Sequence, residues 1–518
     1  MPPKDDNRSN ISGTETIEFL RCIPVNLYCH CLRCVCCGRA TTHRLVMVLL
    51  IMTGIILCYT HRVCLSLAIT EMTIPVNRTK ADVANSCPMP TSGIDRPVIM
   101  DIEGGKFHWD EQTQSLLLGS FYIGYLLTNI PAGYLCDRFG AKWVVTIGCF
   151  ISSVCTLAIP PMTIYTSWHF VVGLRVLTGF GQAPIYPGAT LLMARWIPDA
   201  ERALVGGVVL SSLSIGTIVG NIPTAFILEN MKSWVWVFYI YGIAGIVFCV
   251  LFTIFVYSSP QVHPYITDEE YEYLQVRIAV GEKHKVPWKA ILSDWTVWGC
   301  IICQFGNDYT LFTVITNFPK YLNDVLKFTS KQAGLLVCIP QVALFVGSVT
   351  FGTITDAMVV HCRVKKVTVR VINTFMATMV PTVLLLVCCK LRCNRIGAIS
   401  AITCGMITKS MFYGGLKVSI IDITKHHTGL VAAIVNAAGG VAGFIAPYTI
   451  GNVASENTFE QWDLVAYISL GISVVSIIPY ALFCKAERKI WDHHDNVPEP
   501  EEGEKTGCIK IFSCVNRH

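Results

Sequence analysis

Charged side chains inside long apolar segments are the residues of this sequence most able to do chemistry. Arg62 lies in the apolar segment 45–70, and Arg175 lies in the segment 168–192. Placing such a charge in a membrane helix costs at least about 2.5–3.5 kcal/mol on insertion scales, so each one is a functional candidate. A guanidinium is a planar fork that matches a carboxylate or phosphate and stays charged. Both arginines are therefore candidate anion-binding residues. The alternative for Arg175 is pairing or snorkelling at the outer membrane surface.

Three more charges lie in later apolar segments. Asp308 stands near the middle of the segment 295–318, while Lys409 and Lys417 stand eight residues apart in the segment 396–421. On an ideal helix this spacing places the two lysines about 80° apart, so they share part of one face. We expect Asp308 to pair with a lysine in a cluster that binds an anion, with the carboxylate managing a proton or Na⁺. The alternative for Lys417 is snorkelling to the cytoplasmic face, which is disfavoured for Lys409 near mid-depth.

The elements that must position these residues are membrane helices. The mean hydropathy is +0.52, and 14% of the residues are charged, against roughly 25% in soluble domains. A spanning helix needs about 20 mostly apolar residues. Twelve segments meet this need, at 45–70, 114–135, 142–163, 168–192, 203–228, 234–257, 295–318, 332–354, 367–389, 396–421, 428–451 and 462–484. We therefore predict an all-α membrane protein with twelve transmembrane helices in two pseudo-symmetric six-helix halves.

A charged turn joins the second and third apolar segments. The residues of this turn that we expect to take part in gating are Gly133, Asp137, Arg138, Gly140 and Lys142. Glycines permit close helix approach, and an acid beside bases lets the turn pair internally. A degraded copy, with Gly352, Asp356 and Lys366, lies between two segments of the second half. Two related turns imply two related halves, and bundles that repeat in this way are usually transporters that rock around a central site.

The remaining chain divides around these halves. We place a Cys-rich cytoplasmic tail at 1–43, a six-helix half at 44–257, a cytoplasmic linker at 258–294, a second six-helix half at 295–485 and a cytoplasmic tail at 486–518. The linker contains the capping-box pattern Thr267-Asp-Glu-Glu270, which predicts a short amphipathic helix. The linker is the expected bridge between the two halves.

Loop charges predict the orientation of the chain. In the first half, the loops on the side of the tails carry Arg138, Lys142, Arg195 and Arg202, whereas the opposite loops carry Lys232. Cytoplasmic loops are enriched in Lys and Arg, so both tails are expected in the cytoplasm. The net charge of +5 is a topology signal of this kind and does not indicate a nucleic-acid partner. The outer loop at 72–113 contains the sequon Asn77-Arg-Thr, and we expect Asn77 to be glycosylated.

The 24 cysteines do not resemble a disulfide framework, because most of them lie inside apolar segments. The exception is a run near the amino terminus, in which Cys34, Cys36 and Cys37 stand beside basic residues and a membrane segment. This setting favours S-palmitoylation. The alternative is metal binding by Cys31 and Cys34 with His30, but the segment has no partner module to build a closed zinc site. We expect no metal and no cofactor.

Several motifs in combination resemble a known family. They are Arg62-Val-Cys-Leu-Ser-Leu-Ala68, Phe107-His-Trp-Asp110, Gly119-Ser-Phe-Tyr-Ile-Gly-Tyr125, Asn129-Ile-Pro-Ala-Gly-Tyr134, Arg175-Val-Leu-Thr-Gly179 and Arg195-Trp-Ile-Pro198. The chain resembles the major facilitator superfamily from about residue 44 to 491. Within that superfamily it is similar to the anion:cation symporters, which include sialin, the vesicular glutamate transporters and the type I sodium–phosphate cotransporters. The resemblance implies that Arg62 and Arg175 serve anion binding or gating.

The chain departs from parts of this family. Sialin-like and glutamate-transporting members carry a Glu where this chain has Gln182, and Gln cannot take up and release a proton. The glutamate transporters carry an Arg and a His where this chain has Asn307 and Leu118. These differences disfavour vesicular glutamate transport. A coupling acid must then lie elsewhere, and Asp308 is the candidate.

We therefore expect a secondary active transporter of an organic anion or inorganic phosphate. It would be coupled to Na⁺ or H⁺ or driven by membrane potential, and would lie in the plasma membrane or a lysosomal or vesicular membrane. No Gly-x-x-x-x-Gly-Lys-Ser/Thr motif for ATP is present. The first alternative is a sialin-like proton-coupled exporter of acidic sugars or amino acids, and the second is a non-transporting sensor on the same scaffold. A membrane enzyme using the Cys/His-rich amino terminus is disfavoured, since the apolar segments contain no catalytic constellation.

Overall fold

A computed structural model describes residues 42–73, 87, 106–197, 199–264, 266–277, 286–360, 364–424 and 427–492. Asn77 and the three cysteines predicted to carry lipid lie outside these residues, as does the metal alternative at His30. The side chains of Asp137 and Asp356 also lie outside the described part.

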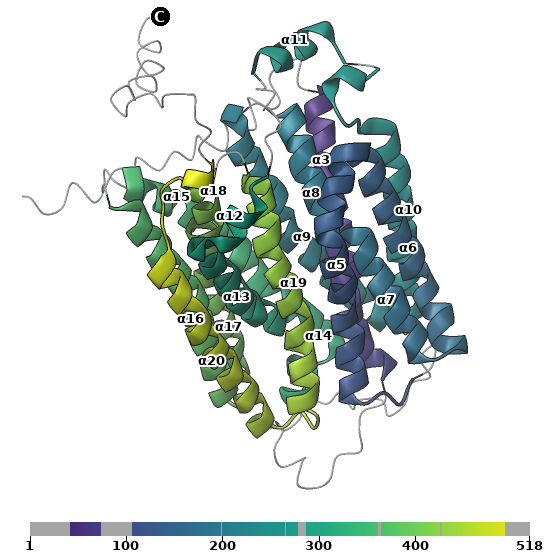
Figure 1. Cartoon of the computed structure of the whole chain (residues 1–518). Helices are drawn as coiled ribbons and strands as arrows, with labels where there is room; N and C mark the ends of the chain where they lie inside the picture. Colours follow the sequence, from purple (N-terminus) through teal and green to yellow (C-terminus); the bar gives the residue numbers. More distant parts are fainter. Residues whose placement is uncertain are drawn as a thin grey trace, which may run out of the picture. The chain divides into compact units, whose positions relative to one another are not determined.

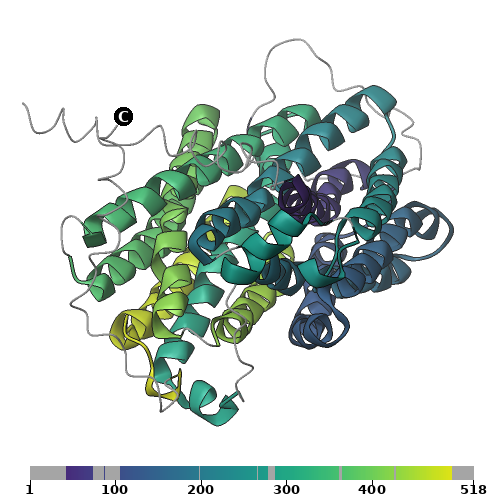
Figure 2. The ribbon, with the colours of Figure 1, turned by 90° about the horizontal axis from the view of Figure 1, so that it is seen from above.

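The described chain is helical and forms two compact units. Unit 1 comprises Met1–Ala68, Asp101–Gly105 and Leu127–Gly281, and unit 2 comprises Ile69–Met100, Lys106–Leu126 and Glu282–His518. Within the described residues no β-strand forms, and an isolated bridge joins Thr73 to Phe107. Figure 2 views the helices from above, where many of them are seen end-on.

Unit 1 is built around the helix α6, which packs against both α7 and α10 (Figure 1). Its core joins side chains of six helices, among them Ile51, Val145, Ile185 and Phe248. The elements of unit 1 are most of α3 (Thr42–Met72), the second half of α5 (Glu111–Phe139), α6 (Ala141–Tyr165), α7 (Trp168–Gln182), α8 (Ile185–Trp196), α9 (Asp199–Met231), α10 (Val235–Phe255), η2 (Pro260–Val262) and α11 (Asp268–Arg277).

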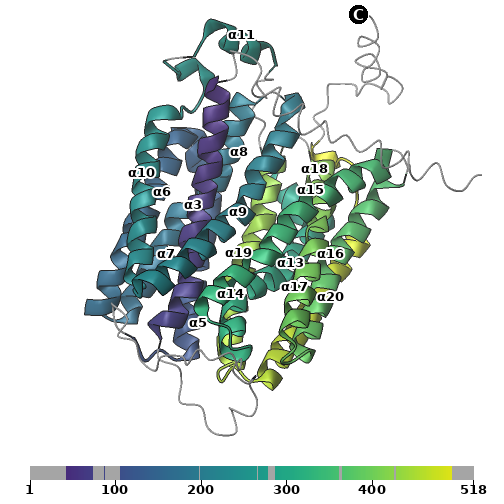
Figure 3. The same ribbon diagram turned by 180° about the vertical axis from the view of Figure 1, so that it is seen from behind.

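Unit 2 is built around the helix α13, which packs against α19 and α20. Helix α16 contacts α17 and α20, and α15 lies beside α17 (Figure 3). Besides the first half of α5, its elements are α12 (Trp288–Ser293), α13 (Trp295–Lys320), η3 (Tyr321–Val325), α14 (Ser330–Leu336), α15 (Cys338–Val360), α16 (Lys366–Lys390), α17 (Arg395–Lys409), η4 (Tyr413–Lys417), α18 (Val418–Ile423), α19 (Thr428–Val453), α20 (Phe459–Phe483) and η5 (Ile490–Asp492).

Each of the twelve predicted segments coincides with one helix or with consecutive helices. Among the described residues, nine helices are long and apolar enough to cross a membrane. The three predicted spans outside that set are α5, α13 and the pair α7–α8. Helices α5 and α13 contain polar side chains of the sites described below, and the pair α7–α8 is one predicted span that is interrupted.

Three predicted segments are divided between consecutive helices: 332–354 falls on α14 and α15, and the breaks in the other two have local causes. The segment 168–192 becomes α7 and α8, separated at Ala183–Pro184, because proline removes a backbone donor and clashes with the preceding turn. The segment 396–421 becomes α17, the π-turn η4 and α18, with Gly415 at φ −94° and ψ −107°. A π-turn widens the helix locally, so the residues on its two sides leave their ideal angular relation.

The linker helix α11 begins as predicted but uses its acid differently. The backbone N–H of Glu270 donates to Thr267 Oγ1 at 3.4 Å, which is one half of the capping box. The buried Glu270 carboxylate lies 3.4 Å from Arg44 Nε of α3 instead of closing the other half of the box. Burial raises the pKa of Glu270, and Arg44 opposes that shift. The ion pair therefore holds the linker helix against the beginning of α3.

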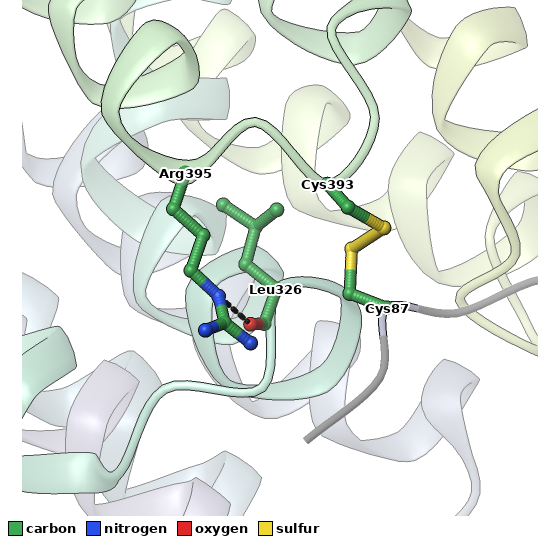
Figure 4. The surroundings of a disulfide bond; sticks show 4 residues. All are labelled: Cys87, Leu326, Cys393 and Arg395. Carbon is green, nitrogen blue, oxygen red and sulfur yellow. Dashed lines mark hydrogen bonds between the residues drawn. A yellow bond between two sulfur atoms is a disulfide. The ribbon is translucent and has the colours of Figure 1, made fainter. Parts of the chain in front are cut away.

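The cysteines form no framework among the described residues, but one pair is bonded that the sequence did not indicate. Cys87 is bonded to Cys393, with 5.4 Å between their Cα atoms (Figure 4), within the range found for disulfides. Around them, Cys87 N–H donates to Val325 O and Arg395 Nε donates to Leu326 O. The bond was not predicted because its two cysteines are 306 residues apart in loops.

Candidate functional site

In unit 1, Arg175 is turned into the protein. Its Nη1 donates to the carbonyl oxygen of His61 at 3.1 Å and its Nη2 to that of Arg62 at 3.3 Å. The side chain is 1% exposed, which excludes snorkelling to a surface. The guanidinium therefore ties α7 to the backbone of α3, immediately beside Arg62.

Arg62 is buried on α3 and has an aromatic neighbour. Its guanidinium carbon lies 4.5 Å from the centroid of the Tyr59 ring, one turn earlier. A cation over an aromatic face is held by the ring quadrupole while its in-plane N–H groups still point sideways. This contact holds the planar guanidinium over the Tyr59 ring.

A hydrogen-bonded chain connects the two arginines with Gln182. His61 Nε2 lies 2.9 Å from the carbonyl oxygen of Tyr241, and its Nδ1 lies 3.4 Å from Ser152 Oγ. Since a carbonyl only accepts, Nε2 donates, and in the neutral ring Nδ1 accepts from Ser152. Gln182 Nε2 donates to the same hydroxyl at 3.0 Å. The position where sialin-like members carry an acid is therefore a neutral, buried link.

In unit 2, Asp308 is held by amides of its own helix. Gln304 Nε2 donates to Asp308 Oδ2 at 2.5 Å, and Asn307 Nδ2 donates to Oδ1 at 3.2 Å. The carboxylate also lies against Gly439 of α19, where any Cβ would collide with Oδ2. The missing side chain of Gly439 thus makes the space that the carboxylate occupies.

Both lysines point into unit 2, but the expected ion pair is absent. Lys409 Nζ donates to the carbonyl oxygen of Asn307, and Lys417 Nζ donates to Asn436 Oδ1, each at 2.5 Å. No ion pair joins Asp308 to either lysine in the described chain. The break at Gly415 explains the difference, because the ideal-helix angle between the lysines no longer applies. Asn436 of α19 is the partner of Lys417.

The turn between α5 and α6 contacts the end of α10. Gly140 has φ +88°, and a Cβ there would lie 2.8 Å from Ser258 Oγ. Lys142 N–H donates to the same hydroxyl at 3.3 Å, and its ammonium lies 3.7 Å from the Tyr257 ring centroid. Arg138 is exposed and donates to the Tyr134 hydroxyl. Gly133 meets nothing closer than Pro187 at 3.9 Å, so only one of the two glycines is required by geometry.

This difference gives a first prediction. Gly140→Ala should destabilise the protein by about 1–3 kcal/mol, because its backbone occupies a region that side chains rarely adopt. Thermal unfolding in detergent should show a lower midpoint than for the matched control Gly133→Ala. Equal midpoints for the two variants would contradict the strain assigned to Gly140.

The sequence pattern missed the neutral members of both clusters. His61, Ser152, Gln304 and Asn436 carry no charge that marks them within an apolar segment. In the described residues, no group of three or more His, Cys, Asp or Glu is arranged to hold a metal ion. The chemistry on offer is hydrogen bonding and charge: guanidinium and ammonium donors for an anion, and one carboxylate that can exchange a cation.

Comparison with known proteins supports a membrane transporter. A family model described as Major Facilitator Superfamily matches residues 51–447. Sialin of Ovis aries is 27% identical over 464 residues, which cover 89% of this chain and 92% of sialin. Vesicular glutamate transporter 2 of Mus musculus is 27% identical over 517 residues, covering 98% and 84%. A Drosophila ananassae protein provisionally named an inorganic phosphate cotransporter is 28% identical over 473 residues, covering 89% and 96%.

Solved structures share the fold at low identity. The crystal structure of a D-xylose–proton symporter has a TM-score of 0.60 and 15% identity, covering 86% of this chain and all of that one. A bacterial homologue of the human lysosomal transporter Spinster has a TM-score of 0.61 and 13% identity, covering 88% and 99%. At such identities the likeness is one of fold alone.

Proposed function

The chain belongs to the major facilitator superfamily, and from that premise we propose that it is a secondary transporter of an organic anion or inorganic phosphate. Membership agrees with the predicted all-α fold of two helical halves. Sialin, the vesicular glutamate transporters and the phosphate cotransporter cover most of the chain, and the last two are named for anions. The protein is accordingly a multi-pass membrane protein of the plasma membrane or of a lysosomal or vesicular membrane.

The observation that carries the proposal is an excess of buried positive charge. Arg62, Arg175 and Lys409 are buried and Lys417 is partly buried, whereas the two clusters contain one carboxylate, Asp308. A charge at membrane depth is costly, so it persists where a ligand or pathway needs it. An anionic substrate would supply the counter-charge.

We assign each candidate residue a role according to the groups to which it is already hydrogen-bonded. Arg175 is engaged with the backbone of α3, so we assign it to positioning Arg62. Lys409 and Lys417 rest on neutral acceptors, which an anion displaces at little electrostatic cost. Asp308 is the candidate for coupling to H⁺ or Na⁺, and Gln182 is a neutral link. The turn at Gly133, Asp137, Arg138, Gly140 and Lys142 serves gating.

The disulfide supports the predicted orientation. Disulfides persist in the extracellular space and in the secretory lumen, and are rare in the cytosol. Cys87 follows α3 and Cys393 precedes α17, and both loops were assigned to the side opposite the tails. Two independent signals, loop charge and cysteine chemistry, thus agree that the tails are cytoplasmic.

The test is uptake by the purified protein in liposomes. Phosphate, urate, sialate and glutamate should be offered with Na⁺ and pH gradients imposed separately. We expect saturable uptake of at least one anion, lost in Arg62→Ala. Sialin-like proton coupling would appear as uptake that follows pH alone. Binding of an anion without uptake under every gradient would favour the sensor, and would overturn the proposal.

A further inference from the structure

The first half of α5 packs along unit 2 through one continuous face. Ser115, Gly119, Tyr122 and Leu126 are four, three and four residues apart, a spacing that lines one face of a helix. Each lies against α19: Ser115 against Gly451, Gly119 against Phe444, Tyr122 against Gly443, and Leu126 against Gly440. Small residues at such contacts let helix backbones approach closely in a membrane.

A charged contact closes the outer end of this packed face. Lys320, at the end of α13, forms an ion pair with Glu111 and donates to Gln114 Oε1 at 2.6 Å. Asn457 Nδ2 donates to the other Glu111 oxygen at 3.2 Å. Lys320 is 7% exposed, so the pair is not a solvated surface bridge. Glu111 is thus held by two groups that follow it in sequence by more than 200 residues.

The disulfide lies at the same end of α13. Cys87 N–H donates to Val325 O, and Arg395 donates to Leu326 O, within the turn that directly follows Lys320 (Figure 4). Cys87, in the connection that leads from α3 into α5, is therefore covalently fastened to the turn before α17 and hydrogen-bonded to the turn that follows α13. Such tethering raises the effective concentration of one partner near the other.

We propose that Glu111 and Lys320 form the latch of an outer gate, and that the Cys87–Cys393 bond holds the latch in register. The inference rests on the proposed transport function. Residues 127–139 of α5 belong to unit 1, whereas residues 111–126 belong to unit 2. A transporter that works by alternating access moves one half against the other. A helix shared by both must release one of them, and the contact to release is the packed face that ends at Glu111.

The ion pair suits a latch because removing one of its two charges costs more free energy than removing both. Removing one partner leaves a buried charge without compensation, whereas removing both leaves two neutral groups. Substituting Glu111 or Lys320 alone should therefore separate the packed face of α5 from α19 more than substituting both does. The reporter is Ser115→Cys, since the serine is buried against Gly451 and the substitution changes its size little.

Purified protein carrying Ser115→Cys should be treated with a charged maleimide, with the chain lacking that cysteine as background. Glu111→Gln and Lys320→Met should each raise the labelling rate by about tenfold, within the roughly 5–150-fold range of coupling between sites. The exchanged pair Glu111→Lys with Lys320→Glu should restore slow labelling. Lys390→Met is the matched control, because its half-exposed pair with Asp463 lies in the same unit without touching α5.

The disulfide is tested in the same assay with the double variant Cys87→Ser and Cys393→Ser. We expect faster labelling than in the parent, and no further change on adding a reductant. Elution as a single species in size-exclusion chromatography confirms that each variant is folded. Labelling that responds no more to Glu111→Gln or Lys320→Met than to Lys390→Met overturns the latch. The assay requires no transport, so a failed uptake experiment with a responsive latch counts against the proposed function alone.

Discussion

Arg62→Ala should abolish anion uptake while the protein folds and elutes as the wild type does. The guanidinium is buried over Tyr59 and positioned by the neighbouring carbonyl contact of Arg175. Losing a buried partner of a bound anion costs about 2–5 kcal/mol, which corresponds to at least about a thirtyfold loss of affinity. Arg62→Lys should rescue poorly, because an ammonium lacks the two-pronged fork. Uptake and KM for the best anion measure this directly.

Arg175 provides the contrast for that experiment. Its two hydrogen bonds hold α7 against α3, so Arg175→Ala should lower the thermal unfolding midpoint as well as uptake. Arg62→Ala should leave the midpoint near that of the wild type. If Arg62→Lys restored full uptake, positive charge alone would be the requirement, and planar recognition of the anion would be ruled out.

Asp308→Asn should uncouple transport from the cation gradient while exchange of anion across the membrane continues. The carboxylate is the one acidic group of the unit 2 cluster, and the variant keeps its shape without its charge. The new amide would face the Gln304 donor, but Gln304 Oε1 has no hydrogen-bond partner. Rotation of that amide by a half-turn therefore supplies an acceptor. The variant is expected to fold.

Concentrative uptake and exchange should be measured in the same vesicles. Gly439→Ala is a second variant, because its Cβ would displace the Asp308 carboxylate without removing the charge. Asp463→Asn is the matched control at the outer end of unit 2. A variant at Asp308 that still concentrates anion against its gradient would make this residue a structural partner of Gln304 and Asn307. Membrane potential would then supply the driving force.

The positions of the helices could be predicted from the sequence because length and hydropathy are strong local signals. Every predicted segment falls on helix, including α5 and α13, whose polar residues dilute the apolar pattern. The breaks at Pro184 and Gly415 are also local, but a membrane helix tolerates both residue types. Their presence alone therefore does not predict an interruption.

The candidate site could be predicted only in part. Charged residues in apolar segments identified Arg62, Asp308 and Lys409, since charge there is rare. The partners of these residues could not be predicted, because a single sequence does not show which distant groups come into contact. Lys320 lies just beyond the predicted segment 295–318, yet it pairs with Glu111 across 209 residues. The neutral chain from His61 to Gln182 likewise depends on three helices coming together.

The bond between Cys87 and Cys393 also places a constraint on biosynthesis. With 306 residues between the two cysteines, synthesis at about 5–20 residues per second separates their emergence by roughly 15–60 s. In the proposed orientation, the Cys87 thiol stays in the lumen without its partner for that interval, while most of the membrane segments are still being inserted. The bond can close only when the loop before α17 has been translocated to the same side. The bond therefore forms only when the later helices have the correct orientation. A chain that inserts one of them wrongly leaves the ribosome with the Cys87 thiol unpaired in the lumen.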